Sequence, residues 1–513
     1  MNFSETKHIS LPVLCAALMA LTAGQSSAQC DPVWSIVNSP NIANRDNQLS
    51  KVAVVSPNDI WVVGNSASSL TSRQTLIQHW NGSTWSIVPS PNATGRTINW
   101  LIGVQAVASN NVWAVGYAGN DPDGAASTNR TLIMRWNGAT WNVVSSPNPQ
   151  PNNPDLGGYP VANELFDLAV VSATDIWAVG HSYTFSNGQP LILHWNGTAW
   201  SNVPAPDTGD YGRLYSVDAV SANDVWALGT EYHNGNQESI VHHWDGISWS
   251  RVPSANDGPF VQEWLGIKAR AADDIWAVGY HNEVFGVNQR YQTSIMHYDG
   301  TSWSVIPSPD VNQESNYLWD VVAIAKDNAY AVGFFDTGVA YQTMIQHWDG
   351  NTWSIVPGTP NRSDFWNSIY GVAAVSSNDV WAVGENFDGF FNFETFILRF
   401  SSPCSSGATM HVADITPTVT TLSNGQFRVR ATVTIRDAGN AAVSGAAVTT
   451  QIKTPNGQII TRTGNTNPAG LFAQTITSRQ HGTYTVTVTN VSKTGATYDP
   501  ASNVETSDSV TIP

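Results

Sequence analysis

The sequence predicts an all-β protein in which a seven-bladed β-propeller is followed by a β-sandwich. Three observations predict this. A hexapeptide of the type DIWAVG recurs seven times, a second motif of the type HWNGTAW follows six of the copies, and neither occurs after residue 384, before the composition changes at residue 405. Forty glycines and 27 prolines indicate many turns, and 42% hydrophobic residues exclude a wholly disordered chain.

Charged side chains are scarce. They make up 12% of the chain, about half of the ~25% usual in soluble domains. The 22 Lys and Arg against 39 Asp and Glu give a formal net charge of −17. Nucleic acids and anionic membrane surfaces both need cationic side chains, so this balance disfavours them as partners. We expect no nucleic-acid partner.

The first 28 residues have the pattern of a signal peptide. An apolar run over 9–24 is followed by Ser26, Ser27 and Ala28, small residues that favour cleavage after Ala28. The run is shorter than the ~20 residues that span a bilayer; a membrane anchor is the alternative. No later segment approaches a transmembrane helix. We therefore expect a secreted protein, extracellular or periplasmic, without membrane insertion.

The hexapeptide marks the same strand in each of seven repeats, which follow one another at intervals of 49 to 64 residues. Its aromatic position is occupied by Trp61, Trp113, Trp177, Trp226, Trp276, Tyr330 and Trp381. Repeats of about 50 residues that contain several short strands are typical of propeller blades. A linear β-array, the alternative, would leave strand edges exposed.

The pattern of each repeat predicts four strands, which we call a to d. Strand a is an apolar run such as LYSVDAV at 214–220, strand b is the hexapeptide, and strand c ends at Trp80 and its equivalents. An Asn-Gly or Asp-Gly pair, such as Asn81 and Gly82, then leads into strand d. Such pairs supply the positive φ that a two-residue hairpin requires.

The two ends of the repeat region complement each other. The seventh repeat lacks strand d, whereas 33–37 (VWSIV) has the pattern of strand d before any other strand has appeared. We expect 33–37 to pair with the strand near 393–400 and to close the ring. The propeller is then predicted over 29–404.

Three cysteines are present, and Cys15 leaves with the signal peptide. Cys30 and Cys404 both fall where the missing hairpin turn of the last blade would be, so we expect a disulfide between them. It would close a loop of roughly 370 residues and contribute roughly 5–6 kcal/mol as an upper bound. An oxidising compartment fits this bond; two unpaired thiols are the alternative.

The repeat resembles known propeller families. A strand ending in Gly and followed by paired aromatics such as Trp80 and Trp85 is similar to the kelch repeat, although Asn65 stands where kelch has a second Gly. DGNTW at 349–353 resembles the Asp-box of sialidase-type propellers, one residue short. The whole of 29–404 is similar to the WAVG/HWNG propeller proteins of secreted bacterial proteomes. This resemblance implies a fold more than an activity.

From residue 405 the Trp residues disappear and Thr alternates with Val, as at 427–435 and 483–489. This pattern predicts a β-sandwich over 405–513. The stretch 482–503 resembles the immunoglobulin-like modules appended to secreted bacterial hydrolases. That resemblance implies an accessory module for attachment or spacing.

Of the 22 Trp, 18 occupy repeat positions, and we expect them to pack between blades. The other four lie where strand d of one blade crosses to strand a of the next: Trp100, Trp264, Trp319 and Trp366. The b–c loops, which open on the same face, add further aromatic residues: Tyr117, Tyr183, Tyr232, Tyr280, Phe334, Phe335, Phe387, Phe390 and Phe391. Aromatic rings beside amides and carboxylates suit sugar rings. The alternative is that these aromatics merely fill the channel mouth.

The candidate ligand-binding residues are therefore on this loop face. They are Trp264, Trp319, Trp366, Trp100, Tyr117, Tyr280, Phe334 and Phe387.

The patterns of the other titratable residues indicate structural roles rather than catalytic or metal-binding ones. Asp59 and its equivalents stand before strand b, where we expect them to bond turn backbone. His79 and its equivalents also recur at one position. The unrepeated His181, His233 and His281 lie on b–c loops but lack the spacing of metal ligands, and 120–124 lacks the downstream Glu of an EF-hand.

No nucleophile elbow, phosphate loop or dinucleotide fingerprint is present. A copper enzyme similar to galactose oxidase is excluded, because no Cys lies between Cys30 and Cys404. We expect no metal and no cofactor.

Three functions remain open. The preferred one is a non-catalytic binding protein, expected to be a monomer, that recognises glycans or surface proteins through the propeller's loop face. A polysaccharide hydrolase or lyase with carboxylates at the channel mouth is the second. A structural component of an envelope or matrix is the third.

Overall fold

The computed structural model describes most of the chain beyond the predicted signal peptide. The described residues are 33–120, 129–149, 162–183, 188–206, 208, 211–233, 236–255, 262–282, 290–387, 389, 392–401, 409–437, 441–493 and 496–513. Cys30, Cys404, Phe390 and Phe391 lie outside these ranges, so the disulfide and the signal peptide stay predictions. Within these ranges no helix is long and apolar enough to span a membrane.

Residues 33–401 form four-stranded antiparallel units in which strands a, b, c and d follow in order. Unit 1 contains β2 (Asp46–Ser56), β3 (Asp59–Ser69), β4 (Ser72–Trp80) and β5 (Trp85–Ile87). Unit 2 contains β6 (Ile98–Ala108), β7 (Asn111–Gly119), β8 (Arg130–Trp136) and β9 (Trp141–Val144). Unit 3 contains β10 (Ala162–Ser172), β11 (Asp175–Tyr183), β12 (Gly188–Trp195) and β13 (Trp200–Val203). Unit 4 contains β14 (Tyr211–Ser221), β15 (Asp224–His233), β16 (Asn236–Trp244) and β17 (Trp249–Val252).

The same order continues to the end of the repeats. Unit 5 contains β18 (Gln262–Ala271), β19 (Asp274–Asn282), β20 (Tyr291–Tyr298) and β21 (Trp303–Val305). Unit 6 contains β22 (Asn316–Ala325), β23 (Asn328–Asp336), β24 (Tyr341–Trp348) and β25 (Trp353–Ile355). Unit 7 contains β26 (Trp366–Ser376), β27 (Asp379–Phe387), β28 (Glu394–Ser401) and, from the other end of the chain, β1 (Val33–Ile36).

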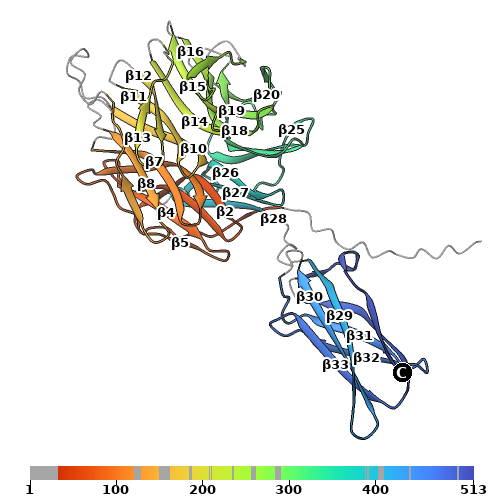
Figure 1. Cartoon of the computed structure of the whole chain (residues 1–513). Coiled ribbons are helices and arrows are strands. Elements are labelled where there is room, and N and C mark those ends of the chain that lie inside the picture. The colour runs from red at the N-terminus through yellow and green to blue at the C-terminus, as the bar shows by residue number, and fades with distance from the viewer. Residues whose placement is uncertain are drawn as a thin grey trace, which may run out of the picture.

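The units stand around one axis as a β-propeller (Figure 1). The first strand of each unit contacts the first strand of the next, and β26 of unit 7 contacts β2 of unit 1, so the ring closes. Single parallel residue pairs, Gly188 with Tyr211 and Tyr341 with Trp366, join units 3 to 4 and 6 to 7 at their edges.

The N-terminal strand completes unit 7, as the sequence predicts. β1 pairs antiparallel with β28, with Trp34 opposite Phe400, and Val37 N donates to Ile397 O at 2.9 Å. The Trp34 ring lies 5.9 Å from Tyr330 of unit 6. Strand pairing and aromatic packing therefore both hold the first strand in the ring.

The repeated Trp residues form the core between units. In each unit the strand-b aromatic packs on the aromatics that end strand c and begin strand d of the next unit. Trp276 is 2% exposed and lies 5.0 Å from Trp348 and 5.2 Å from Trp353. Across the closure, Trp381 packs on Trp80 at 5.1 Å. The prediction that these residues pack between blades is confirmed.

The repeated Asp residues have partners other than those expected. Asp59 Oδ1 accepts Trp61 Nε1–H at 2.9 Å and lies 2.8 Å from His79 Nε2. In unit 7, Arg399 replaces the His and contacts Asp379 at 2.8 Å. The carboxylate thus joins strands b and c through side chains, which corrects the expectation of turn-backbone bonds.

Residues 409–512 form two four-stranded sheets, coloured blue in Figure 1. Their elements are β29 (Thr409–Thr421), β30 (Phe427–Asp437), β31 (Ala447–Lys453), β32 (Ile459–Asn465), β33 (Leu471–Ser478), β34 (Gly482–Ser492), β35 (Thr497–Tyr498), the 3-10 helix η2 (Pro500–Ser502) and β36 (Ser507–Ile512). The sheets β33-β30-β29-β35 and β32-β31-β34-β36 share one hydrophobic core that includes Met410, Val433, Val448 and Tyr484. This arrangement is a β-sandwich.

Candidate functional site

The innermost strand of every unit carries a β-bulge at the same place. In unit 1 the register shifts between Leu49 and Lys51, and the other six units shift at the equivalent residues. A bulge leaves one residue out of the ladder and re-aims its side chain. We call the seven bulged residues the axial ring: Ser50, Ile102, Phe166, Tyr215, Leu265, Trp319 and Tyr370.

The axial ring lines a hollow of about 310 Å³ on the propeller axis, together with Gln48, Lys51 and Trp100. We call it the axial hollow. Gln48, Ser50 and Lys51 come from β2 and make one wall polar, whereas the other six units supply mainly apolar and aromatic side chains. The hollow is therefore amphipathic, with one hydrogen-bonding side.

Part of the polar wall is already bonded within the protein. Ser50 Oγ accepts Trp100 Nε1–H at 3.1 Å, and Gln48 Oε1 accepts from Asn65 Nδ2 at 2.9 Å. Trp319 Nε1 is buried and finds no acceptor among the described residues. It is a donor that a bound acceptor could satisfy.

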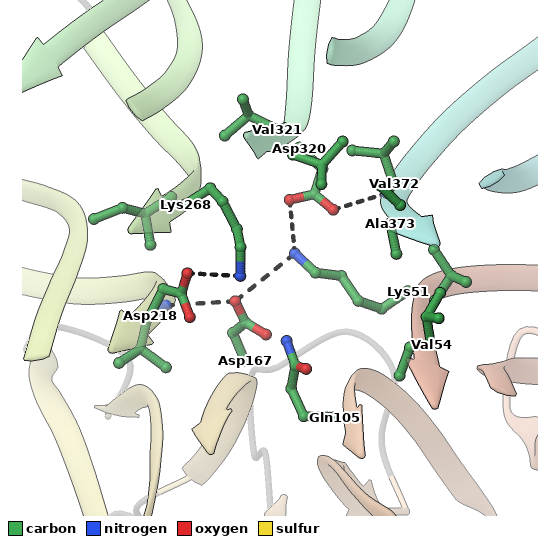
Figure 2. A pocket seen from close by; sticks show the side chains of 16 residues that line it. Lys51, Val54, Gln105, Asp167, Asp218, Lys268, Asp320, Val321, Val372 and Ala373 are labelled. Atoms are coloured by element: carbon green, nitrogen blue, oxygen red, sulfur yellow. Dashed lines mark hydrogen bonds and ion pairs between the residues drawn. The ribbon is translucent and has the colours of Figure 1, made fainter. Parts of the chain in front are cut away.

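A second hollow of about 200 Å³ lies next along the axis, and Lys51 lines both. Figure 2 shows two ammonium and three carboxylate groups converging there. Lys51 Nζ lies 2.9 Å from Asp320 Oδ1 and 3.7 Å from Asp167 Oδ2, and Lys268 Nζ lies 2.8 Å from Asp218 Oδ2. We call these five residues the ionic plug.

Within the ionic plug, Lys51 fastens units that are not neighbours, whereas Lys268 and Asp218 join the adjacent units 5 and 4. Lys51 of unit 1 reaches units 3 and 6 across the axis. The carboxylates also accept backbone N–H groups of adjacent units: Val372 N donates to Asp320 at 2.9 Å. Burial lowers the pKa of the Lys51 ammonium, but the carboxylates of Asp167 and Asp320 outweigh it and hold the pKa above its usual value. Lys51 therefore stays charged.

Glycine makes room for the ionic plug. A Cβ on Gly371, the unit 7 equivalent of Lys51, would lie 2.9 Å from the Lys51 Cα, and one on Gly266 would lie 2.8 Å from the Asp320 Cα. These distances are shorter than any ordinary carbon contact. The inner strands can approach this closely only because glycine precedes each of these charged positions around the ring.

Three carboxylates near the axial hollow each accept a tyrosine hydroxyl. Tyr370 donates to Glu385 at 2.8 Å, Tyr280 to Glu263 at 2.6 Å, and Tyr183 to Glu164 at 3.0 Å. The partners of Glu385 do not offset its desolvation, so burial raises the pKa of Glu385 to about 7.

The pKa of Glu164 moves the other way. Burial raises it, but hydrogen bonds and the charge of His181, with Asn129 and Tyr183, more than compensate and lower the pKa.

The structure brings Trp100 and Trp319 together in the axial hollow but places Trp264 elsewhere. Trp264 is 1% exposed and packs between units with Trp226. It pairs with Gly279, in the position that Leu49 occupies against Gly64 in unit 1. Trp264 is therefore a core residue, which corrects its prediction as a stacking platform.

Trp366 belongs to a chain of aromatic contacts over units 5, 6 and 7. We call it the rim arc, and it contains Tyr280, Tyr291, Tyr317, Phe334, Tyr341, Trp366, Phe393 and Phe387. Successive ring centroids lie 4.6 to 5.7 Å apart. Trp366 is 36% exposed. Elsewhere in the arc, the Phe334 ring stacks on Trp319, which lines the axial hollow, with the two ring centroids 6.2 Å apart. Tyr117 lies outside the arc, 6.1 Å from Trp100.

Sequence reasoning missed most of the axial ring and all of the ionic plug. Phe166, Tyr215 and Tyr370 look like ordinary members of apolar strand-a runs. The signal that could have found them is variation. The bulged position of strand a holds six residue types over the seven units, from Ser50 to Trp319, whereas the position before it is Leu in five of them.

The unrepeated histidines whose side chains the structure describes, His181 and His281, have separate partners. His181 Nε2 lies 3.3 Å from Glu164, and His281 Nδ1 lies 2.7 Å from Ser294 Oγ. Across the part of the chain that the structure describes, no group of three or more His, Cys, Asp or Glu residues could hold a metal ion.

Comparisons with known proteins find distant likeness in structure alone. No protein-family model and no curated protein sequence matches the chain. YCF48 from Cyanidioschyzon merolae is 13% identical at a TM-score of 0.43, covering 72% of this chain and 98% of its own. The polysaccharide lyase Uly1 is 12% identical at 0.44, covering 74% and 94%. Sqt1 of Chaetomium thermophilum, bound to the N-terminus of ribosomal protein L10, is 10% identical at 0.40, covering 77% and 97%. At these scores, function has to be argued from this chain's own residues.

Proposed function

We propose that this chain is a secreted, monomeric, non-catalytic binding protein that recognises glycans, free or carried by surface proteins. In this proposal a seven-bladed propeller over 29–404, closed by β1, carries the binding face. Residues 1–28 are the signal peptide, and an immunoglobulin-like sandwich over 405–513 serves as the accessory module.

The amphipathic axial hollow is the observation that carries this proposal. A pyranose ring has an apolar C–H face and a polar edge of hydroxyls. Trp319 and Tyr370 offer rings for the first, and the Ser50 hydroxyl and the Trp319 indole N–H offer hydrogen bonds for the second. The rim arc continues this aromatic surface outward from Phe334.

The charges near the hollow favour an uncharged ligand. Lys51 lies on Asp320, and Arg213 lies 3.4 Å from Glu263. Arg73 stands over the Trp100 ring at 4.9 Å and donates to Asn65. Cations engaged in this way give an anionic ligand little to gain.

One feature of the sandwich supports the immunoglobulin-like assignment. Tyr484 is fully buried near the start of β34, and its hydroxyl donates to Gln480 O at 2.9 Å. A buried Tyr that bonds backbone a few residues upstream is the tyrosine corner of such domains. Tyr484→Phe would remove this bond and leave the packing unchanged.

A glycan array probed with the mature protein tests the binding proposal. We expect retention of neutral glycans, and weaker retention by Trp319→Ala protein that melts like the wild type. An array without any retained glycan would contradict the proposal.

Cleavage of a polysaccharide is the second candidate, and Glu385 favours it. A carboxyl with a pKa of about 7 keeps its proton in about half of the molecules at neutral pH, and Tyr370, its hydrogen-bond donor, lines the hollow. In this candidate, that pair would pass a proton to a glycosidic oxygen. Release of reducing ends or unsaturated sugars, lost in Glu385→Gln, would establish cleavage; stable substrates would exclude it.

A further inference from the structure

We infer that the axial hollow takes the terminal residue of a neutral glycan chain, entering end-on, and does not bind internal segments. The inference rests on the proposed function and deepens it, because it specifies which part of a glycan is recognised. It depends on three features of the propeller axis: a closed floor, a closed wall and a small volume.

The ionic plug closes the floor. Lys51 lies at the junction of the two hollows, and its ammonium is held from opposite sides by Asp320 at 2.9 Å and Asp167 at 3.7 Å. Passing a chain through this point would leave the ammonium and the carboxylates buried without their partners, which is strongly unfavourable. A polymer therefore cannot thread along the axis.

The wall is closed as well. One axial-ring residue comes from each of the seven units, so the inner strands surround the hollow completely. Neighbouring inner strands approach so closely that a Cβ on Gly103 would lie 2.9 Å from the Asp167 Cα. A chain that entered from the loop face has no exit between the units.

The volume of the axial hollow fits the terminal residue of a glycan chain rather than an internal segment. About 310 Å³ is at the lower limit of the ~300–1,000 Å³ of ligand pockets. An internal segment would have to bend into the hollow and back out, with two chain passages in that space. A terminal residue needs only one.

The hollow also fixes how a terminal ring would lie. Trp319 and Tyr370 come from neighbouring units, and their rings favour the apolar face of the sugar. The polar wall of β2 is then left for the hydroxyl edge. The unpartnered Trp319 Nε1 can donate to a hydroxyl oxygen.

Oligosaccharides of defined length test this inference. The probes are neutral gluco-, manno-, galacto- and xylo-oligosaccharides from monosaccharide to hexasaccharide, titrated calorimetrically into the full mature chain. In parallel arms the non-reducing end is capped by a bulky substituent or the reducing end is reduced to the alditol, which shows which end enters. We expect the dissociation constant per chain to be independent of length, and to rise at least tenfold when the recognised end is modified.

Paired variants locate the site. Ile102→Trp fills the hollow and should abolish binding, whereas Trp366→Ala on the rim arc should keep the preference for ends. If Ile102→Trp does not fold, Trp319→Ala, which enlarges the hollow, replaces it and should weaken binding several-fold. Loss of binding in Trp366→Ala with full binding in the hollow variants would overturn the inference.

The outcomes separate the inference from the proposed function. If no probe binds, the proposed function fails. If probes bind with an affinity that rises with chain length and ignores capping at both ends, the protein binds glycans but the end-on inference is wrong. Tighter binding of uronate-terminated probes than of their neutral counterparts would overturn the neutral specificity.

Discussion

The outer part of each propeller unit and its inner strand obey different rules, although they belong to the same repeat. On the outside, the same contacts recur: an Asp lies 2.8 Å from a His in units 1, 3 and 5, and a strand-b aromatic packs on the next unit in all seven. On the axis, Ser, Ile, Phe, Tyr, Leu, Trp and Tyr occupy one equivalent position.

The difference separates the positions that stabilise the fold from the positions that are free to recognise a ligand. Interfaces between units are equivalent around the ring, so the same side-chain contacts can stabilise every interface. The axis is a single shared space in which the seven units contribute six different types of side chain. Equal side chains there would give a symmetric hole, whereas unequal ones give a polar wall on β2 and mainly apolar and aromatic walls on the other six units.

Removing an outer Trp should have the largest effect on stability. We expect Trp276→Ala to lower the free energy of unfolding by about 3–5 kcal/mol, because Trp276 packs on Trp348 and Trp353. Denaturant unfolding measures this, with Trp319→Ala as the matched control on the axis. If Trp319→Ala unfolds as readily as Trp276→Ala, Trp319 is a core residue and the distinction between outside and axis is wrong.

Breaking the ionic plug from one side should cost about 3 kcal/mol or more. Asp320→Ala leaves Lys51 with one carboxylate at 3.7 Å and removes the acceptor of Val372 N. The double variant Lys51→Met/Asp320→Leu removes both charges and should recover part of the loss. Chemical denaturation of the three proteins checks this, and a double variant less stable than Asp320→Ala would contradict it.

The pH dependence of stability should report Glu385. Its folded pKa of about 7 exceeds the ordinary value of 4.5, so between these values the folded state binds more protons than the unfolded state. The contribution of Glu385 to the free energy of unfolding is fully present below about pH 4.5. It falls as the pH rises toward 7, by at most about 3 kcal/mol. Glu385→Gln should flatten the curve over this window. An unchanged slope in the variant would exclude Glu385 as its source.

The smallest expected effect is on binding. Ring stacking contributes on the order of 1 kcal/mol beyond burial, so Trp319→Ala should weaken glycan binding several-fold while its melting temperature stays close to that of the wild type. Titration with a retained glycan measures this. Trp264→Leu, which restores the side chain usual at that position, is the control and should bind normally. Equal weakening in both variants would show that the loss is not local to the hollow.

Much of the fold follows from the sequence because its signals are local and repeated. The hexapeptide fixes strand b, the Asn-Gly and Asp-Gly pairs fix the c–d turns, and VWSIV at 33–37 identifies β1 without any structure. Trp264 shows the limit of this reasoning. Both Trp264 and Trp319 break the repeat, but they hold adjacent positions of strand a. Trp264 precedes the bulge and points into the core, whereas Trp319 is the bulged residue and points to the axis.

The ionic plug shows a second limit. Lys51, Asp167 and Asp320 are more than a hundred residues apart in the chain, and each lies on the strand a of a different unit. Only the closed ring brings both carboxylates within 4 Å of the Lys51 ammonium. No local pattern in the sequence contains that information.

The pairing of β1 with β28 also constrains how the protein is made. During synthesis the first propeller strand emerges with no partner, and it gains one only after the strand ending at Ser401 has followed it. Until then the nascent propeller is an open arc with unpaired strand edges at both ends, and such edges pair readily with other chains. A chain truncated before β28 would keep those edges permanently, so premature termination within the repeats would yield an aggregating product rather than a smaller ring.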